Sequence, residues 1–212
     1  MSMSRLLTAF VKITGWPVQF LCFRTKITYR NRAVQSRRLK GAAIVVSNHT
    51  SVYDYAVLLF VFFGRILRTQ MAELLFHKKL LGAFLKGMGG IYVDRNSHDM
   101  GFVRQSLSIL DKGGVLCVFP EARLPRQGEE RPLPFQTSAI YIALESGAPI
   151  VPVYTNGSYF QKKRARVRIG TPIDARALWH ADEDEKTNLE RITGAVRETV
   201  IELGRELERE QA

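Results

Sequence analysis

The chain has very little cysteine and, over its first quarter, no acidic residue at all. Cys22 and Cys117 are the two cysteines among 212 residues, and both lie in apolar stretches. They provide neither a disulfide framework nor the spacing of a metal site, so we expect buried thiols in a reducing compartment. The first acidic residue is Asp54. Every charged side chain in residues 1–53 is therefore a cation, Lys or Arg.

Positive charge dominates the whole chain. There are 31 Lys and Arg against 20 Asp and Glu, which gives a formal net charge of +11. Such an excess indicates an anionic partner, which could be nucleic acid, anionic lipid or a phosphorylated substrate. No recognisable nucleic-acid motif accompanies the charge, so we expect no nucleic acid. The length fits one domain with a substantial core.

The N-terminal segment lacks the uninterrupted run of about 20 apolar residues that a membrane-spanning helix requires. Residues 6–23 are largely aliphatic and aromatic, but they include Lys12, Gln19 and Pro17. This mixture is typical of a segment in a membrane interface, where cations meet lipid phosphates. We predict an amphipathic two-helix membrane-binding motif, broken at Gly15-Trp16-Pro17, within an N-terminal unit of residues 1–40 that ends in a lead-in strand. Packing on the protein's own core, a membrane span and a signal peptide are the alternatives.

Strand and helix patterns alternate over residues 41–212. Strands are predicted at 42–46, 67–71, 115–119 and 149–154, and helices at 73–86, 99–110, 136–145 and 188–211. This order predicts a single α/β domain, with a mixed or parallel central sheet flanked by helices. Residues 164–169 alternate between cationic and apolar side chains, as an edge strand does.

The first of these strands ends in a polar turn that carries His49 and Asp54. In a continuous helix these two residues would point about 140° apart, and in a strand they would face opposite sides. They meet if the chain turns at Thr50-Ser51. A carboxylate there would fix the tautomer of the imidazole, which could then accept a proton from a substrate hydroxyl. The alternative is structural, because Ser51 to Asp54 also fits a helix capping box.

Two further strand ends carry functional side chains. Asp94-Arg95 follows the short strand that begins at Gly90, and Glu121-Ala122-Arg123 follows the strand that ends at Phe119. If these strands are neighbours in one sheet, the three ends converge on one crevice. The alternatives are purely structural: an ion pair at Asp94-Arg95 and a turn cap at Glu121.

Four blocks in this order resemble the glycerolipid acyltransferase family. Asn48 to Asp54 resembles its His-x4-Asp motif, and Gly90 to Arg95 its second block. Phe119-Pro120-Glu121 is similar to the start of the third block, and Ile150 to Val153 to the fourth. The nearest class is the 1-acyl-glycerol-3-phosphate acyltransferases.

The resemblance implies a reaction and roles for its residues. His49, oriented by Asp54, would deprotonate the free hydroxyl of the lysophospholipid 1-acyl-glycerol 3-phosphate. The alkoxide would attack the thioester of acyl-CoA or acyl-carrier protein and give phosphatidate. Arg95 and Arg123 would bind the acceptor's phosphate, and Glu121 would position the acceptor or hold one of those arginines. No metal and no permanently bound cofactor is expected. The family implies a peripheral enzyme on the cytoplasmic face of an anionic membrane.

The third block departs from the family pattern, which most often reads Phe-Pro-Glu-Gly-Thr-Arg-Ser. Here Ala122 stands where the family has glycine, and Leu124 stands at the customary arginine position. The substitution at Ala122 matters if the position requires a positive φ angle. An acyltransferase for another acceptor, such as glycerol 3-phosphate or a lyso-aminolipid, and a non-catalytic lipid- or nucleic-acid-binding protein are the alternatives.

Overall fold

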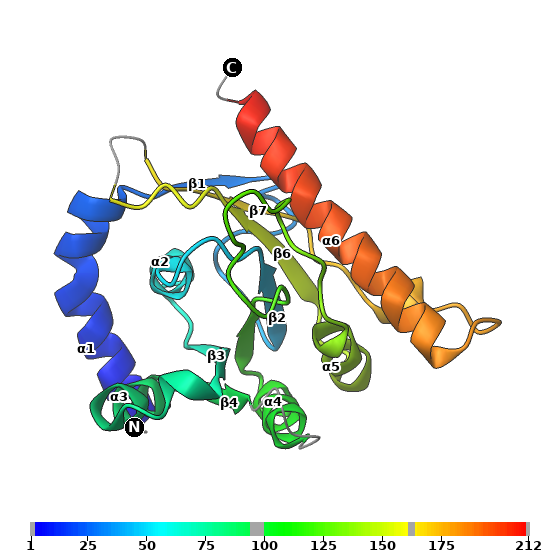
Figure 1. The fold of residues 1–212 in the computed structure, drawn as a ribbon, viewed down its shortest axis with the longest axis horizontal. Helices are drawn as coiled ribbons and strands as arrows, with labels where there is room; N and C mark the ends of the chain where they lie inside the picture. Colours follow the sequence, from blue (N-terminus) through cyan, green and yellow to red (C-terminus); the bar gives the residue numbers. More distant parts are fainter. Residues whose placement is uncertain (1–2, 94–99, 161–163, 211–212) are drawn as a thin grey trace.

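A seven-stranded sheet forms the centre of the computed structural model, which describes residues 3–93, 100–160 and 164–210 (Figure 1). Its spatial order is β1-β7-β6-β2-β5-β3-β4. The strands are β1 (Lys26–Tyr29), β2 (Ala43–Ser47), β3 (Leu67–Ala72), β4 (Ile91–Val93), β5 (Val115–Val118), β6 (Ile150–Thr155) and β7 (Arg166–Ile169). All neighbours are parallel except the antiparallel pair β6 and β7. The predicted mixed sheet is therefore confirmed.

The two central strands, β2 and β5, place the polar turns that follow them at one edge. Every residue of both strands is buried, as expected for strands covered on both faces. Val46 lies opposite Val118 in the parallel register. Residues shortly after each of these two positions therefore leave the sheet side by side.

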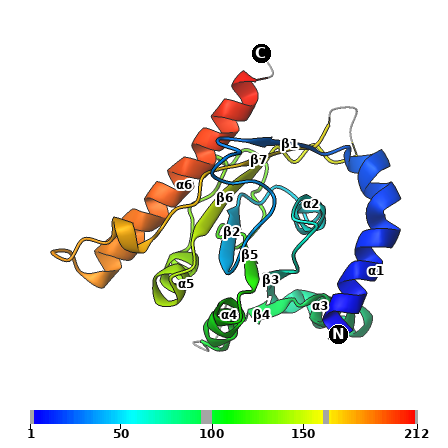
Figure 2. The same cartoon turned by 180° about the vertical axis from the view of Figure 1, so that it is seen from behind.

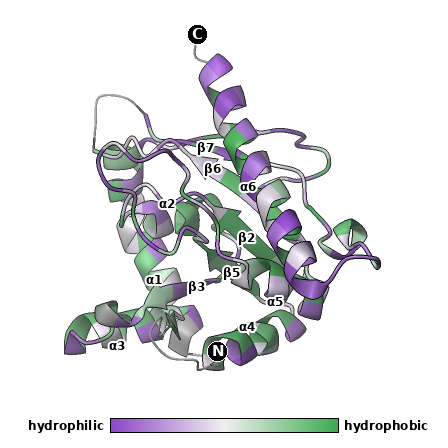
Figure 3. Cartoon of the chain, turned by 45° about the vertical axis from the view of Figure 1, so that its right-hand side comes forward, coloured by the Kyte–Doolittle hydropathy of each residue, from purple (hydrophilic) through white to green (hydrophobic). Residues whose placement is uncertain are grey.

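Helices cover both faces of the sheet (Figures 1 and 2). Helix α2 (Asp54–Val61) packs on the face that includes Val45, whereas α5 (Ser138–Ser146) and α6 (Glu185–Arg209) share a core with Ile44. Helix α4 (Gly101–Asp111) contributes to that second core. Figure 3 shows the hydrophobic colour on β2 and β5 at the centre, while α6 carries hydrophilic turns outside.

The N-terminal segment is helical, but the predicted break at Gly15-Trp16-Pro17 is wrong. Helix α1 (Met3–Val18) continues through Pro17 and passes directly into the π-helical turn η1 (Gln19–Phe23). A proline removes one helical hydrogen bond, and its effect here is a change of helix type rather than a reversal of the chain. Residues Arg5–Phe23 are long and apolar enough to cross a membrane by length and composition.

Lys12 fixes α1 to the rest of the protein from the inner side of the helix. Its side chain is almost fully buried, and Nζ donates to the carbonyl oxygens of Phe63 (2.6 Å) and Arg65 (2.7 Å). Burial lowers the pKa of this ammonium to about 8. The cation therefore faces the protein, and the apolar side chains of the helix face outward.

Two other expectations fail because they depend on packing between distant elements. β7 is an interior strand, and Arg168 is buried with Nε 2.8 Å from Glu206 on α6. The helix predicted over residues 73–86 divides into a 3-10 turn η2 (Glu73–Leu75) and α3 (Lys79–Met88), which is capped by Gly89. The division into an N-terminal unit of residues 1–40 and a domain of residues 41–212 stays a prediction. Strand β1, which lies before residue 40, is an edge strand of the central sheet.

Candidate active site

A fully buried carboxylate organises the turn that follows β2. Asp54 has no exposed surface, and its Oδ2 lies 2.9 Å from Nδ1 of His49. The same oxygen accepts from the backbone N–H groups of Thr50 (2.6 Å) and Ser51 (2.8 Å). The Thr50 hydroxyl donates to Oδ1 at 2.9 Å. These bonds compensate the burial of the charge and hold the imidazole beside it.

Asp54 fits the structural alternative only in part. Its Oδ2 accepts from the Ser51 amide, as the acidic residue of a capping box does. The N-cap of α2 is Tyr53, however, and no side chain makes a capping bond there. The same Oδ2 lies beside Nδ1 of His49, so one oxygen holds both the turn and the imidazole.

The His49 ring lies on an aromatic support with one edge accessible. It stacks on Phe119, with ring centroids 4.5 Å apart and planes 23° from parallel. The side chain is 21% exposed. Because Nδ1 faces Asp54, the remaining nitrogen Nε2 is the one available to a substrate proton. Nδ1–H donation to the carboxylate would leave Nε2 as the basic atom.

Tyr159 also binds Asp54, although the sequence gave no indication of it. Its hydroxyl donates to Oδ1 at 2.5 Å and lies 2.7 Å from the Thr155 hydroxyl. Burial and the neighbouring Asp54 charge raise the pKa of Tyr159 well above its usual value, so it remains a neutral donor. Tyr159 lies 105 residues from Asp54. No local pattern links positions so distant in the chain.

Asn48 joins the turn to the neighbouring strand β6. Its side chain accepts from the Thr155 amide (2.8 Å) and donates to the Thr155 carbonyl (2.9 Å). The amide thus reproduces a strand-like pairing beyond the end of β2. Asn48 belongs to the block that resembles the family motif, but its bond to β6 was not predicted.

Glu121 holds the backbone of the His49 turn. One carboxylate oxygen accepts from the His49 amide at 2.7 Å, and the other accepts from the Leu133 amide at 2.8 Å. Burial raises the pKa of Glu121, and the two amide bonds act in the opposite direction. The described bonds of this carboxylate therefore go to the backbone rather than to an arginine. Its expected role with the acceptor is untested.

Arg123 lies at an exposed place and is already paired. Its two terminal nitrogens bind the two oxygens of Glu129 at 2.7 and 2.8 Å. The preceding residue, Ala122, has φ of 60°, in the left-handed region that favours glycine. The position at which the family most often has glycine thus does require a positive φ. Arg95, the other predicted phosphate ligand, lies outside the described residues together with Asp94.

A cavity of about 480 Å³ lies beyond Phe119, at the ends of β3, β4 and β5. Its lining includes Met71, Phe102 and Val118 together with Gln136 on the polar side. Phe119 belongs to the lining and contacts the His49 ring, so the cavity adjoins the dyad. Among the residues that the structure describes, no three His, Cys, Asp or Glu side chains gather to hold a metal ion.

Comparison with known proteins first defines the class of fold. A 1-acyl-sn-glycerophosphate acyltransferase, PlsC, of Thermotoga maritima has a similar structure, with a TM-score of 0.62 over 95% of this chain and 79% of that one. The sequence identity is 20%. The mixed sheet with flanking helices is therefore a fold shared with that protein.

The sequence then identifies the family. The Acyltransferase family profile matches residues 26–156, so the chain belongs to the acyltransferase family. It is 28% identical to the 1-acyl-sn-glycerol-3-phosphate acyltransferase of Bacillus subtilis, over 63% of this chain and 67% of that protein. It is 29% identical to the human beta enzyme of the same name, over 76% of this chain and 59% of that enzyme. The match to the human alpha enzyme is 30% identical and spans 51% of its length.

Proposed function

We propose that this protein transfers an acyl chain from an acyl thioester to the free hydroxyl of 1-acyl-glycerol 3-phosphate, giving phosphatidate for phospholipid synthesis. The observation that carries the proposal is the bond between Asp54 and Nδ1 of His49, because it leaves Nε2 as the base. Membership of the acyltransferase family and the names of the relatives support the reaction type.

The proposed reaction needs no nucleophile from the protein. Nε2 of His49 removes the proton of the acceptor hydroxyl as its oxygen attacks the thioester carbonyl. The tetrahedral intermediate then collapses, the carbon–sulfur bond breaks, and the imidazolium returns the proton to the leaving thiolate. Asp54 stabilises the imidazolium between these steps. The product is an ester and a free thiol of coenzyme A or acyl-carrier protein, and no permanently bound cofactor takes part.

The oxyanion of that intermediate requires hydrogen-bond donors. The amides of Thr50 and Ser51 already donate to Asp54 and hold the carboxylate. The proposed donors are therefore other groups than these two amides.

Acceptor binding is proposed for the loops after β4 and β5. Arg123 would exchange Glu129 for the acceptor's phosphate, since a guanidinium binds both groups through the same paired nitrogens. Arg95 is proposed as a second phosphate ligand. Glu121 would act indirectly, by fixing the His49 amide against the loop that carries Arg123. The cavity beside Phe119, whose apolar wall includes Met71 and Phe102, is a candidate place for an acyl chain.

The proposed location is the cytoplasmic face of an anionic membrane, and the exposed N-terminal helix supports the membrane contact itself. Phe10, Ile13, Phe20 and Leu21 are each more than 60% exposed on α1 and η1. Leu80, on the neighbouring helix α3, is 90% exposed. Exposed apolar side chains gathered in this way are typical of a contact surface, and a lipid interface suits them.

The test is an acceptor panel on purified wild type and a His49→Ala variant. We expect 1-acyl-glycerol 3-phosphate to be the best acceptor, ahead of glycerol 3-phosphate and lyso-aminolipids. His49→Ala should lower kcat by about 10²–10⁴-fold, the usual contribution of a general base, with an unchanged melting temperature. His77→Ala, at an exposed position, is the matched control. An active His49→Ala variant would refute the mechanism, and a better acceptor would refute the substrate.

A further inference from the structure

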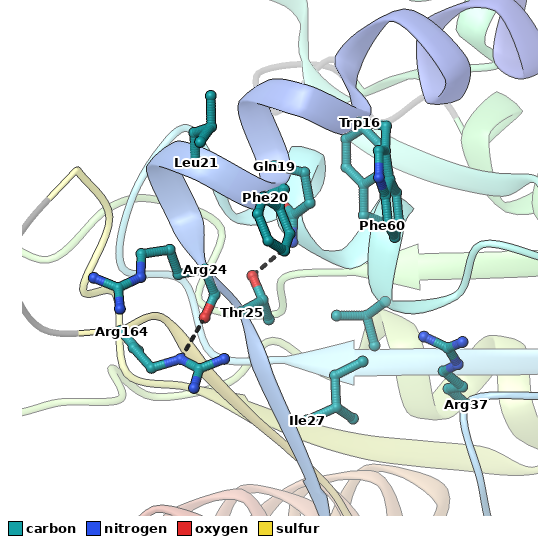
Figure 4. A pocket seen from close by; sticks show the side chains of 11 residues that line it. Trp16, Gln19, Phe20, Leu21, Arg24, Thr25, Ile27, Arg37, Phe60 and Arg164 are labelled. Atoms are coloured by element: carbon teal, nitrogen blue, oxygen red, sulfur yellow. Dashed lines mark hydrogen bonds between the residues drawn. The ribbon is translucent and has the colours of Figure 1, made fainter.

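A second cavity, of about 520 Å³, lies between the N-terminal helix and the sheet, and neither His49 nor Asp54 belongs to its lining (Figure 4). Its apolar wall comes from Trp16 and Phe20 on the N-terminal segment and from Phe60 on α2. Helix α2 begins beside His49 at Asp54, so its Phe60 end is roughly 9 Å farther along the helix axis. The cavity is therefore distinct from the proposed reaction site.

Three arginines line this cavity, and no acidic residue does. They are Arg24, Arg37 and Arg164. Nε of Arg164 donates to the backbone carbonyl oxygen of Arg24 at 2.9 Å, and both residues lie on the same side of the cavity (Figure 4). Over the described parts of the chain, no ion pair joins any of the three to a carboxylate. By contrast, Arg30 and Arg168 share Glu206.

The end of η1 fixes the backbone of Arg24. Arg24 is the C-cap of this turn, with φ of 48° and ψ of 41°, the left-handed conformation in which helices commonly end. Two bonds hold the segment: the Arg24 amide donates to the Gln19 carbonyl at 3.0 Å, and the Gln19 side chain donates to the Thr25 hydroxyl at 2.6 Å. The direction in which the chain leaves η1 is therefore fixed beside the cavity.

We propose that this cavity binds the phosphate of an anionic phospholipid headgroup. Guanidinium groups bind phosphate through paired nitrogens, and two adjacent cations without a carboxylate favour an anion between them. Phe20 and Leu21, which precede Arg24, are 68% and 69% exposed, so the cavity opens beside the apolar surface proposed to enter the membrane. The inference deepens the proposed membrane binding by giving it a discrete site. It does not depend on acyl transfer.

Vesicle binding by the full chain tests the proposal. Phosphatidylcholine vesicles with and without phosphatidylglycerol are compared for wild type, Arg24→Gln/Arg164→Gln and Arg24→Lys/Arg164→Lys. The control, Arg205→Gln/Arg209→Gln, removes the same charge from α6, on the other side of the molecule from α1 (Figures 1 and 2). Melting temperatures report on folding. Inorganic phosphate is titrated as a competitor at constant ionic strength.

A discrete site predicts a graded result on vesicles that contain phosphatidylglycerol. The glutamine pair should bind at least about tenfold more weakly, from the loss of two cations at the membrane surface. The lysine pair keeps the charge but loses the paired nitrogens, so it should bind about threefold more weakly. The control should change by less than about twofold. Binding to pure phosphatidylcholine should be equal for all four proteins.

Several results would overturn the inference. A lysine pair that binds like wild type, or a control as weak as the glutamine pair, would indicate diffuse attraction instead of a site. Phosphate binding that the glutamine pair loses, with vesicle binding intact, would assign the cavity to a soluble phosphate. If wild type binds both kinds of vesicle equally, the proposed headgroup site is refuted. The acceptor panel would still test acyl transfer independently.

Discussion

Two loops leave the adjacent strands β2 and β5 at the same edge of the sheet, and they are held very differently. The loop after β2 surrounds Asp54, which has no exposed surface and receives bonds from Thr50, Ser51, His49 and Tyr159. The loop after β5 is fixed at Glu121, but Arg123 beyond it is 47% exposed and binds a carboxylate of the same loop.

This difference separates two requirements of a group-transfer site. Proton transfer needs an imidazole with a fixed direction, and that geometry exists before any substrate binds. Recognition of an acceptor tolerates side chains that exchange partners. The loop after β5 is also where the sequence departs from the family pattern. We therefore expect substitutions in the loop after β2 to affect the rate most, and substitutions in the loop after β5 to affect binding or stability.

The largest effect is expected from Asp54→Asn. It removes the charge that orients His49 and stabilises its protonated form, so kcat should fall by about 10³–10⁴-fold. If Asp54 acts through His49, the same substitution in a His49→Ala background should cost less than about threefold more. Asp111→Asn, at an exposed helix end, is the control. Retention of a tenth of the wild-type rate would limit Asp54 to a structural role in the turn.

Tyr159→Phe should have the next largest effect. Loss of one hydrogen bond to a charged group should lower kcat by about tenfold, with little change in KM. The hydroxyl contacts Asp54 rather than His49, so its effect should pass through the Asp54–His49 pair. The same substitution in a His49→Ala background should therefore cost less than about threefold more.

The double variant separates positioning from simple support of the fold. Tyr154→Phe, on strand β6 shortly before Tyr159, is the control and should leave kcat unchanged. A further tenfold loss in the His49→Ala background would mean that the Tyr159 hydroxyl supports the fold and does not act through His49.

Contacts between residues close together in the chain could be predicted from the sequence, and contacts between distant residues could not. His49 and Asp54 are five residues apart, so one predicted turn was enough to bring them together. The polar residues after successive strands indicated the edge of the sheet at which they lie. Tyr159 could not be found, because its place depends on how β6 and the segment after it return to the turn. The interior position of β7 was missed for the same reason. Alternation of charge along a strand does not reveal that α6 supplies Glu206 to Arg168.

Arg123→Gln tests the loop after β5. If Arg123 exchanges Glu129 for the acceptor's phosphate, the variant should raise KM for 1-acyl-glycerol 3-phosphate by about fivefold and leave kcat near wild type. Glu129→Gln frees the guanidinium, so its KM should be equal to or below that of wild type. An unchanged KM in Arg123→Gln would show that the ion pair is structural and that acceptor binding resides elsewhere.

The smallest expected effect concerns stability at Ala122. Its φ of 60° lies where a Cβ atom is unfavourable, so Ala122→Gly should raise the free energy of unfolding by about 0.5–1 kcal/mol. Ala195→Gly makes the same chemical change at an exposed position inside α6, where it should lower that free energy by about 1 kcal/mol. Urea unfolding of the two variants measures both. Destabilisation by both would mean that the loop after β5 relaxes without cost around alanine, and that the departure from the family's glycine has no energetic consequence.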